Sequence, residues 1–119
     1  MTTPHPGQVV RGQELEEWLE RSRDPDPLER VRAAAHLCPC HTRVNNSRVW
    51  ERILEMAEDP HPRVRGTVLH AMADGSPREL EARIVAKVEG LYHDPDLKLR
   101  RRARKLLAHH RRTGKLNVL

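Results

Sequence analysis

A short segment recurs three times along the 119-residue chain, and this recurrence limits the possible folds more than any other feature. The copies are residues 26–32, 59–65 and 94–100, and each combines Asp and Pro with a closing aliphatic–Arg pair. Their leading Asp residues are 33 and then 35 positions apart. A period of this length is typical of helical repeat arrays.

The apolar residues between these copies follow a helical period. In the first such stretch, Leu15, Trp18 and Leu19 have the i, i+3, i+4 spacing of one buried helix face. Pro, Gly and Asp-Pro pairs separate the periodic stretches, where they end helices or begin new ones. We predict an all-α fold of six helices in three antiparallel pairs, over residues 13–22, 26–38, 47–58, 62–73, 77–92 and 97–112.

The core-facing side of each helix follows from the same spacing. For the second helix we expect Val31, Ala35 and Cys38 to point inward. For the last helix we expect Leu99, Ala103, Leu106 and Leu107 to do so.

The helix starts at 26–32, 59–65 and 94–100 resemble those of the HEAT-repeat family. The resemblance covers roughly residues 13–112 and implies a right-handed α-solenoid of three helical hairpins, at about 13–38, 47–73 and 77–112. Residues 1–12 would be a flexible lead and residues 113–119 a tail. The resemblance also implies a polar ladder that joins the turn Asp residues to one Arg on each second helix, namely Arg32, Arg65 and Arg100.

The charge is distributed unevenly. Residues 1–96 carry 13 basic and 17 acidic side chains, a net −4, whereas residues 97–119 carry nine basic and no acidic ones, a net +9. A basic terminal block of this kind favours an acidic partner or a nucleic-acid backbone. The two cysteines are too few for a disulfide framework, and the N-terminus lacks a signal-peptide pattern, so we expect a cytoplasmic protein that spans no membrane.

A concave groove lined by the second helices is the expected binding surface. Its basic residues would attract an acidic protein segment or, alternatively, nucleic-acid phosphates. Aromatic residues that could stack on bases are scarce, which disfavours single-strand recognition. The predicted partner-binding residues are Arg30, Arg63, Lys98, Arg101, Arg104, Lys105, Arg111 and Arg112.

A second hypothesis concerns metal binding. His36, Cys38, Cys40 and His41 lie within six residues and are ligand types that zinc accepts. Their Cys-x-Cys spacing is poor for zinc, however, and Cys38 also fits a buried helix end. We therefore favour no bound metal and no cofactor.

Catalysis is not expected. The eight histidines are scattered along the chain, and none has a Ser or Asp neighbour at a spacing that suggests a triad or a general base. A non-catalytic scaffold module is the function that the sequence favours.

Overall fold

A computed structural model describes residues 12–38 and 46–116 of the chain. These residues form six α-helices and one short 3-10 helix, which confirms the predicted all-α fold. The elements are α1 (Gly12–Arg21), α2 (Pro27–Leu37), α4 (Ser47–Met56), α5 (Pro62–Ala73), η1 (Arg78–Leu80), α6 (Glu81–Gly90) and α7 (Leu97–Thr113).

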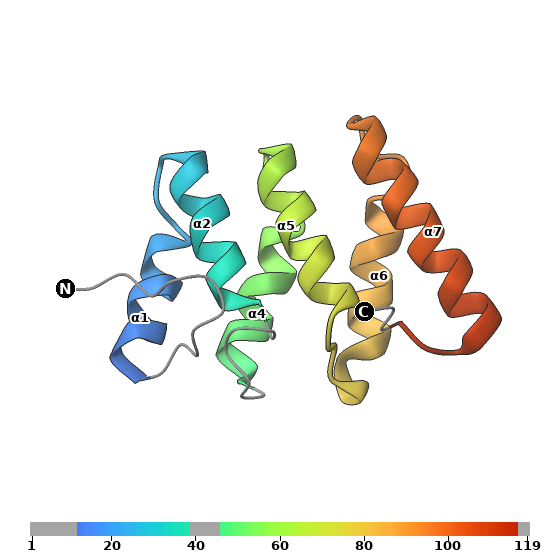
Figure 1. Ribbon diagram of the computed structural model, residues 1–119, viewed down its shortest axis with the longest axis horizontal. Helices are drawn as coiled ribbons and strands as arrows, with labels where there is room; N and C mark the ends of the chain where they lie inside the picture. The colour runs from blue at the N-terminus through green and yellow to red at the C-terminus, as the bar shows by residue number, and fades with distance from the viewer. Residues whose placement is uncertain (1–11, 39–45, 117–119) are drawn as a thin grey trace.

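The helices are arranged in two layers (Figure 1). Helices α2, α5 and α7 lie side by side in one layer, and α1, α4 and α6 form the other. Each helix of the first layer packs on its hairpin partner in the second, and α5 packs between α2 and α7. The result is a short α-solenoid of three helical hairpins.

Each helix of the α2 layer begins at a side chain that accepts a hydrogen bond from the first helical turn. Asp26 accepts from the Leu28 amide at 3.0 Å, and Asp96 accepts from the Leu99 amide at 3.0 Å. His61 fulfils the same function for α5 through its ring nitrogen. Such caps satisfy amides that have no partner within the helix. At the other end of α7, Gly114 has a φ of +72°, a left-handed conformation that glycine adopts easily.

One apolar core runs through all three hairpins, from Trp18 in α1 to Leu116 after α7. The predicted inward positions of α7 are all buried. The prediction for α2 holds only in part, because Val31 and Ala35 are half-buried, although Val31 still packs against the core. The core itself receives Ala33, Ala34 and Leu37, since small side chains at 33 and 34 let α1 and α5 approach α2 from two sides.

The polar ladder is present, but its first Arg is Arg30 and not Arg32. The Arg30 guanidinium donates to Asp59 at 2.9 and 3.2 Å. Arg65 donates to Asp94 in the same two-pronged way at 2.8 and 3.0 Å. Arg32 instead pairs with Glu29 on its own helix and is exposed.

The ladder corrects the repeat register. Arg30, Arg65 and Arg100 each donate to the backbone carbonyl six positions earlier, at Asp24, Asp59 and Asp94 respectively. Equivalent positions are therefore 35 residues apart in both steps. The predicted register of the first repeat was shifted by two residues, because residues 24–27 contain two consecutive Asp-Pro pairs. The first pair forms the corner of the repeat, and the second supplies the cap and first residue of α2.

The ladder holds the pKa values of its carboxylates below the ordinary value. Partial burial tends to raise the pKa of Asp59, but hydrogen bonds from Arg30 and from the His61 amide hold that pKa below its ordinary value. Burial likewise tends to raise the pKa of Asp94, and Arg65 with the Asp96 amide outweighs this effect. Each pair joins neighbouring repeats through side chains that are mostly removed from water.

Candidate binding groove

A groove with a volume of about 570 Å³ lies across the layer of α2, α5 and α7. Its position confirms that the second helices of the hairpins enclose a shared cleft. The lining residues are Val31, Ala35, Cys38, Pro62, Arg63, Gly66, Thr67, His70, Asp96, Lys98, Leu99 and Arg102.

The 35-residue register relates positions on α2, α5 and α7 in three rows that run across the helices. Each row has one member on α2, one on α5 and one on α7. The rows are Leu28, Arg63 and Lys98; Val31, Gly66 and Arg101; and Ala35, His70 and Lys105. Six of the nine members line the groove, and Leu28, Arg101 and Lys105 do not.

These rows form a gradient of chemistry along the solenoid. The α2 members are apolar, the α7 members are all basic, and α5 contributes one Arg, one Gly and one His. Among the residues that line the groove, α2 contributes Val31, Ala35 and Cys38, whereas the α7 side contributes Lys98 and Arg102 beside Leu99 and the cap residue Asp96.

At Gly66, no side chain projects from α5 into the groove. A Cβ atom at this position would lie 3.3 Å from Leu99 Cδ2 and 3.5 Å from Arg102 Nη1. The missing side chain allows α7 to approach α5 and leaves the α5 backbone accessible. Arg102 was not among the predicted binding residues. Its proximity to Gly66 depends on how α5 and α7 pack, which helix periodicity alone does not give.

The predicted binding residues do not all lie at the groove. Arg63 and Lys98 line it, whereas Arg101 and Lys105 are exposed on α7 and do not. Arg30 belongs to the ladder and is not available to a partner, which corrects its predicted role. Arg111 and Arg112 are exposed near the end of α7, outside the groove.

Arg104 has a structural contact of its own. Its guanidinium donates to the Tyr92 carbonyl at 2.9 Å and stacks 4.2 Å from the centre of the Tyr92 ring. These contacts fasten α7 to the end of α6, so Arg104 is less available for a partner than the sequence suggested.

The two layers differ in how their charges are matched. On the α1 layer, exposed pairs connect successive helices: Arg48 with Glu16, Arg83 with Glu51, and Lys87 with Glu58. Hydrogen bonds from these cations lower the pKa values of the three glutamates. Within the described residues, by contrast, the side chains of Arg63, Lys98, Arg101, Arg102 and Lys105 form no ion pair with an acidic residue. These five cations on the groove layer are therefore not neutralised by an acidic neighbour among the described residues.

The structure does not bring together the predicted metal ligands that it describes. His36 is buried and its ring stacks on Trp18, with centroids 4.0 Å apart and an interplanar angle of 4°. Its Nδ1 atom lies 3.0 Å from the Arg32 carbonyl oxygen. Cys38 lies elsewhere, beside α5, and Cys40 and His41 fall outside the described residues.

Fold and groove together define a small α-helical repeat protein with a groove along one of its two layers. The family model for HEAT repeats matches residues 14–108, which is most of the chain. The chain therefore belongs to the HEAT-repeat family, whose members typically serve as protein-interaction or scaffold modules. Comparison with curated proteins and with solved structures gave no match.

Within the part of the chain that the structure describes, no helix is both long and apolar enough to cross a bilayer.

Proposed function

We propose that this chain is a non-catalytic HEAT-repeat binding module whose groove holds an acidic segment of a partner protein. The observation that carries this proposal is the set of groove-layer cations that form no ion pair with an acidic residue. On the opposite layer, by contrast, three ion pairs connect successive helices. Cations held on neighbouring helices attract an acidic segment and accelerate its association.

The gradient along the groove narrows the chemistry of the segment. An apolar residue of the partner would contact Val31 and Ala35, while its acidic residues would lie against Lys98 and Arg102. Gly66, between these ends, would let the partner lie close to the α5 backbone. Apolar contacts at one end and charges at the other would fix the direction in which the segment lies.

The test uses charge reversal in the groove. The double variant Lys98→Glu with Arg102→Glu reverses two cations that line the groove without touching the ladder. A matched variant, Arg32→Glu with Arg78→Glu, changes the net charge equally at two exposed positions outside the groove. Each full-length protein would be used to capture partners from native lysate, with and without nuclease treatment, and the retained proteins would be identified.

We expect the wild-type chain and the matched variant to retain the same protein after nuclease treatment, and the groove variant to lose it. Retention of that protein by the groove variant would contradict the groove as the binding surface.

Nucleic-acid binding is the second candidate, because the net +9 of residues 97–119 would also neutralise phosphates. This function predicts that retention disappears with nuclease. It also predicts that affinity for a DNA duplex falls steeply with salt and is lost in the groove variant. The apolar α2 end of the groove favours the protein partner.

A further inference from the structure

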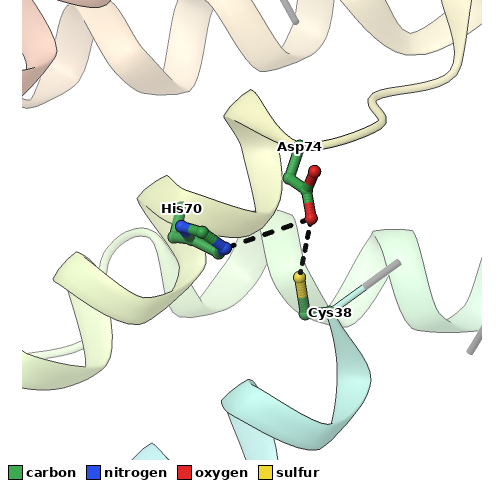
Figure 2. A group of neighbouring side chains, drawn as sticks. All are labelled: Cys38, His70 and Asp74. Carbon is green, nitrogen blue, oxygen red and sulfur yellow. Dashed lines mark hydrogen bonds and ion pairs between the residues drawn. The ribbon is translucent and has the colours of Figure 1, made fainter. Parts of the chain in front are cut away.

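Three potential metal ligands meet where α2 and α5 end (Figure 2). Cys38 caps the C-terminus of α2, and Asp74 caps that of α5. His70 lies one turn before Asp74, on the same face of α5. The thiol, imidazole and carboxylate atoms all lie within 4.8 Å of one another.

We propose that Cys38, His70 and Asp74 form a binding site for a divalent transition-metal ion, with Zn²⁺ as the best match. These residues differ from the contiguous set suggested by the sequence, with which they share only Cys38. The inference is independent of the proposed partner binding, because it rests on a different set of atoms.

The spacing of the three ligands suits a tetrahedral ion. Tetrahedral coordination at ordinary zinc–ligand lengths separates such ligand atoms by about 3.4–3.6 Å. The Asp74 carboxylate lies 3.8 Å from Cys38 Sγ and 4.0 Å from His70 Nε2. These two distances would need to contract by about 0.2–0.6 Å, and the separation of Cys38 Sγ from His70, which is at most 4.8 Å, would need to close to about 3.6 Å to create the site. The exposed His70 side chain can supply this movement by rotating.

The donor set selects the kind of metal. A thiolate with an imidazole favours zinc, cobalt or copper over magnesium and calcium, which prefer all-oxygen sites. On binding, the Cys38 thiol would lose its proton to solvent, and the sulfur would donate its electron pair to the metal. The charges of thiolate and carboxylate would then balance a divalent cation.

Two features of the fold favour a cation at this position. The C-termini of α2 and α5 both lie there, and each carries the partial negative charge of its helix dipole. Cys38 is buried and fixed by the packing of α2 on α5, which gives the site one rigid ligand.

The site also opens onto the binding groove. Cys38 and His70 line the groove, and three protein ligands leave the fourth tetrahedral position unused. A water molecule or a carboxylate of a bound segment could occupy that position.

The experiment uses the full chain, stripped of metal with a chelator and titrated with Co²⁺. We expect a thiolate-to-cobalt charge-transfer absorption band, and we expect Zn²⁺ to displace the cobalt and abolish the band. Cys38→Ser should lose the band. His70→Gln and Asp74→Asn should each weaken cobalt binding at least about tenfold, the smallest loss usual even for an outer partner of a ligand.

Two control variants separate this site from the alternatives. Cys40→Ser retains the other ligands of the contiguous stretch, and His93→Gln removes an exposed histidine elsewhere. Both should keep the band, with affinity changed by less than about twofold, as expected for uncoupled sites.

The proposal is overturned if the wild-type chain shows no band. It is equally overturned if the band is lost in Cys40→Ser but kept in Cys38→Ser, or if His70→Gln binds cobalt as tightly as the wild type. His70 is exposed, so we expect His70→Gln to fold like the wild type. Its cobalt affinity therefore tests the site even if Cys38→Ser is unstable.

Discussion

At the scale of single residues, Arg30 links two neighbouring repeats. It joins the corner carbonyls of its own repeat to the Asp59 carboxylate of the next one. Its side chain is 14% exposed and that of Asp59 is 7% exposed, so neither charge could recover full hydration if the other were removed. Arg32, two positions later, has an exposed pair with Glu29 that contributes little.

This contrast gives the first prediction. Arg30→Ala should lower the free energy of unfolding by about 3 kcal/mol, because it leaves Asp59 largely buried without its counter-ion. Arg32→Ala should change it by less than about 0.5 kcal/mol, as is usual for an exposed position. Urea denaturation of the two variants beside the wild type measures both values. Equal effects in the two variants would contradict the 35-residue register.

The second prediction concerns acid stability. Asp59 and Asp94 have pKa values held below the ordinary 3.8 in the folded chain, so the unfolded chain takes up protons first as the pH falls. The stability that these carboxylates contribute is complete well above pH 4 and is lost as the pH falls through their lower folded pKa values. We expect the double variant Asp59→Asn with Asp94→Asn to be less stable at pH 7 and to lose less stability between pH 5 and 2.

Thermal unfolding across this pH range tests the expectation. The exposed pairs at Glu16, Glu51 and Glu58 remain in the variant and account for any residual slope. A slope as steep as that of the wild type would show that the ladder carboxylates do not control acid stability.

Residue periodicity alone did not distinguish Arg30 from Arg32. Both belong to an Arg-x-Arg motif that follows two consecutive Asp-Pro pairs, and either Asp could have begun the repeat. The spacing of 35 between Asp59 and Asp94 held the answer, since applying it once more leads to Asp24. The carbonyl contacts of Arg30, Arg65 and Arg100 show which choice the packing makes.

At the scale of helices, Gly66 and Gly90 show how the same residue type has different consequences. Gly66 lies within α5 against α7, where an added Cβ would lie 3.3 Å from a buried Leu99 methyl group. Gly90 is the last residue of α6, and an added Cβ would meet nothing within 4 Å.

We therefore predict that Gly90→Ala stabilises the chain by about 0.5–1 kcal/mol, because alanine costs less conformational entropy in a helix. Gly66→Ala should show little or none of this gain, since the same benefit is offset by crowding against Leu99. Thermal denaturation of the two variants compares them directly. A stabilisation of Gly66→Ala as large as that of Gly90→Ala would show that α7 can move away from α5 without cost.

The helices themselves were readily predicted, because their caps, prolines and apolar spacing all agree. The buried face of α2 was not predicted correctly, because Ala33 and Ala34 are weaker hydrophobic signals than Val31 and Cys38. Helix α2 must contact α1 and α5 at once, and small residues permit both contacts. The cluster of Cys38 with His70 and Asp74 was invisible for a similar reason, as its members come from different repeats.

At the scale of the whole molecule, no hairpin can bury its apolar face alone, so stability resides largely at the two inter-repeat interfaces. The core is continuous across both interfaces, and each is crossed by one buried ladder pair, Arg30 with Asp59 and Arg65 with Asp94. We expect a single cooperative unfolding transition for the wild-type chain.

The tryptophans allow this cooperativity to be measured. Trp18 and Trp50 are buried in the first two hairpins, whereas α6 and α7 contain no tryptophan. Tryptophan fluorescence therefore reports on the first two hairpins, and far-ultraviolet circular dichroism reports on all helices. In urea the two signals should change together for the wild type and for Arg32→Ala.

Arg65→Ala should separate the two signals, because it breaks the ladder between the second and third hairpins and leaves Asp94 buried without its counter-ion. The circular dichroism transition should then begin at a lower urea concentration than the fluorescence transition, as α6 and α7 unfold first. Arg30→Ala weakens the interface between the first and second hairpins, which contain Trp18 and Trp50. In this variant the fluorescence transition should begin at a urea concentration no higher than that of the circular dichroism transition. Coincident transitions in Arg65→Ala would mean that apolar packing alone couples the third hairpin to the rest of the solenoid.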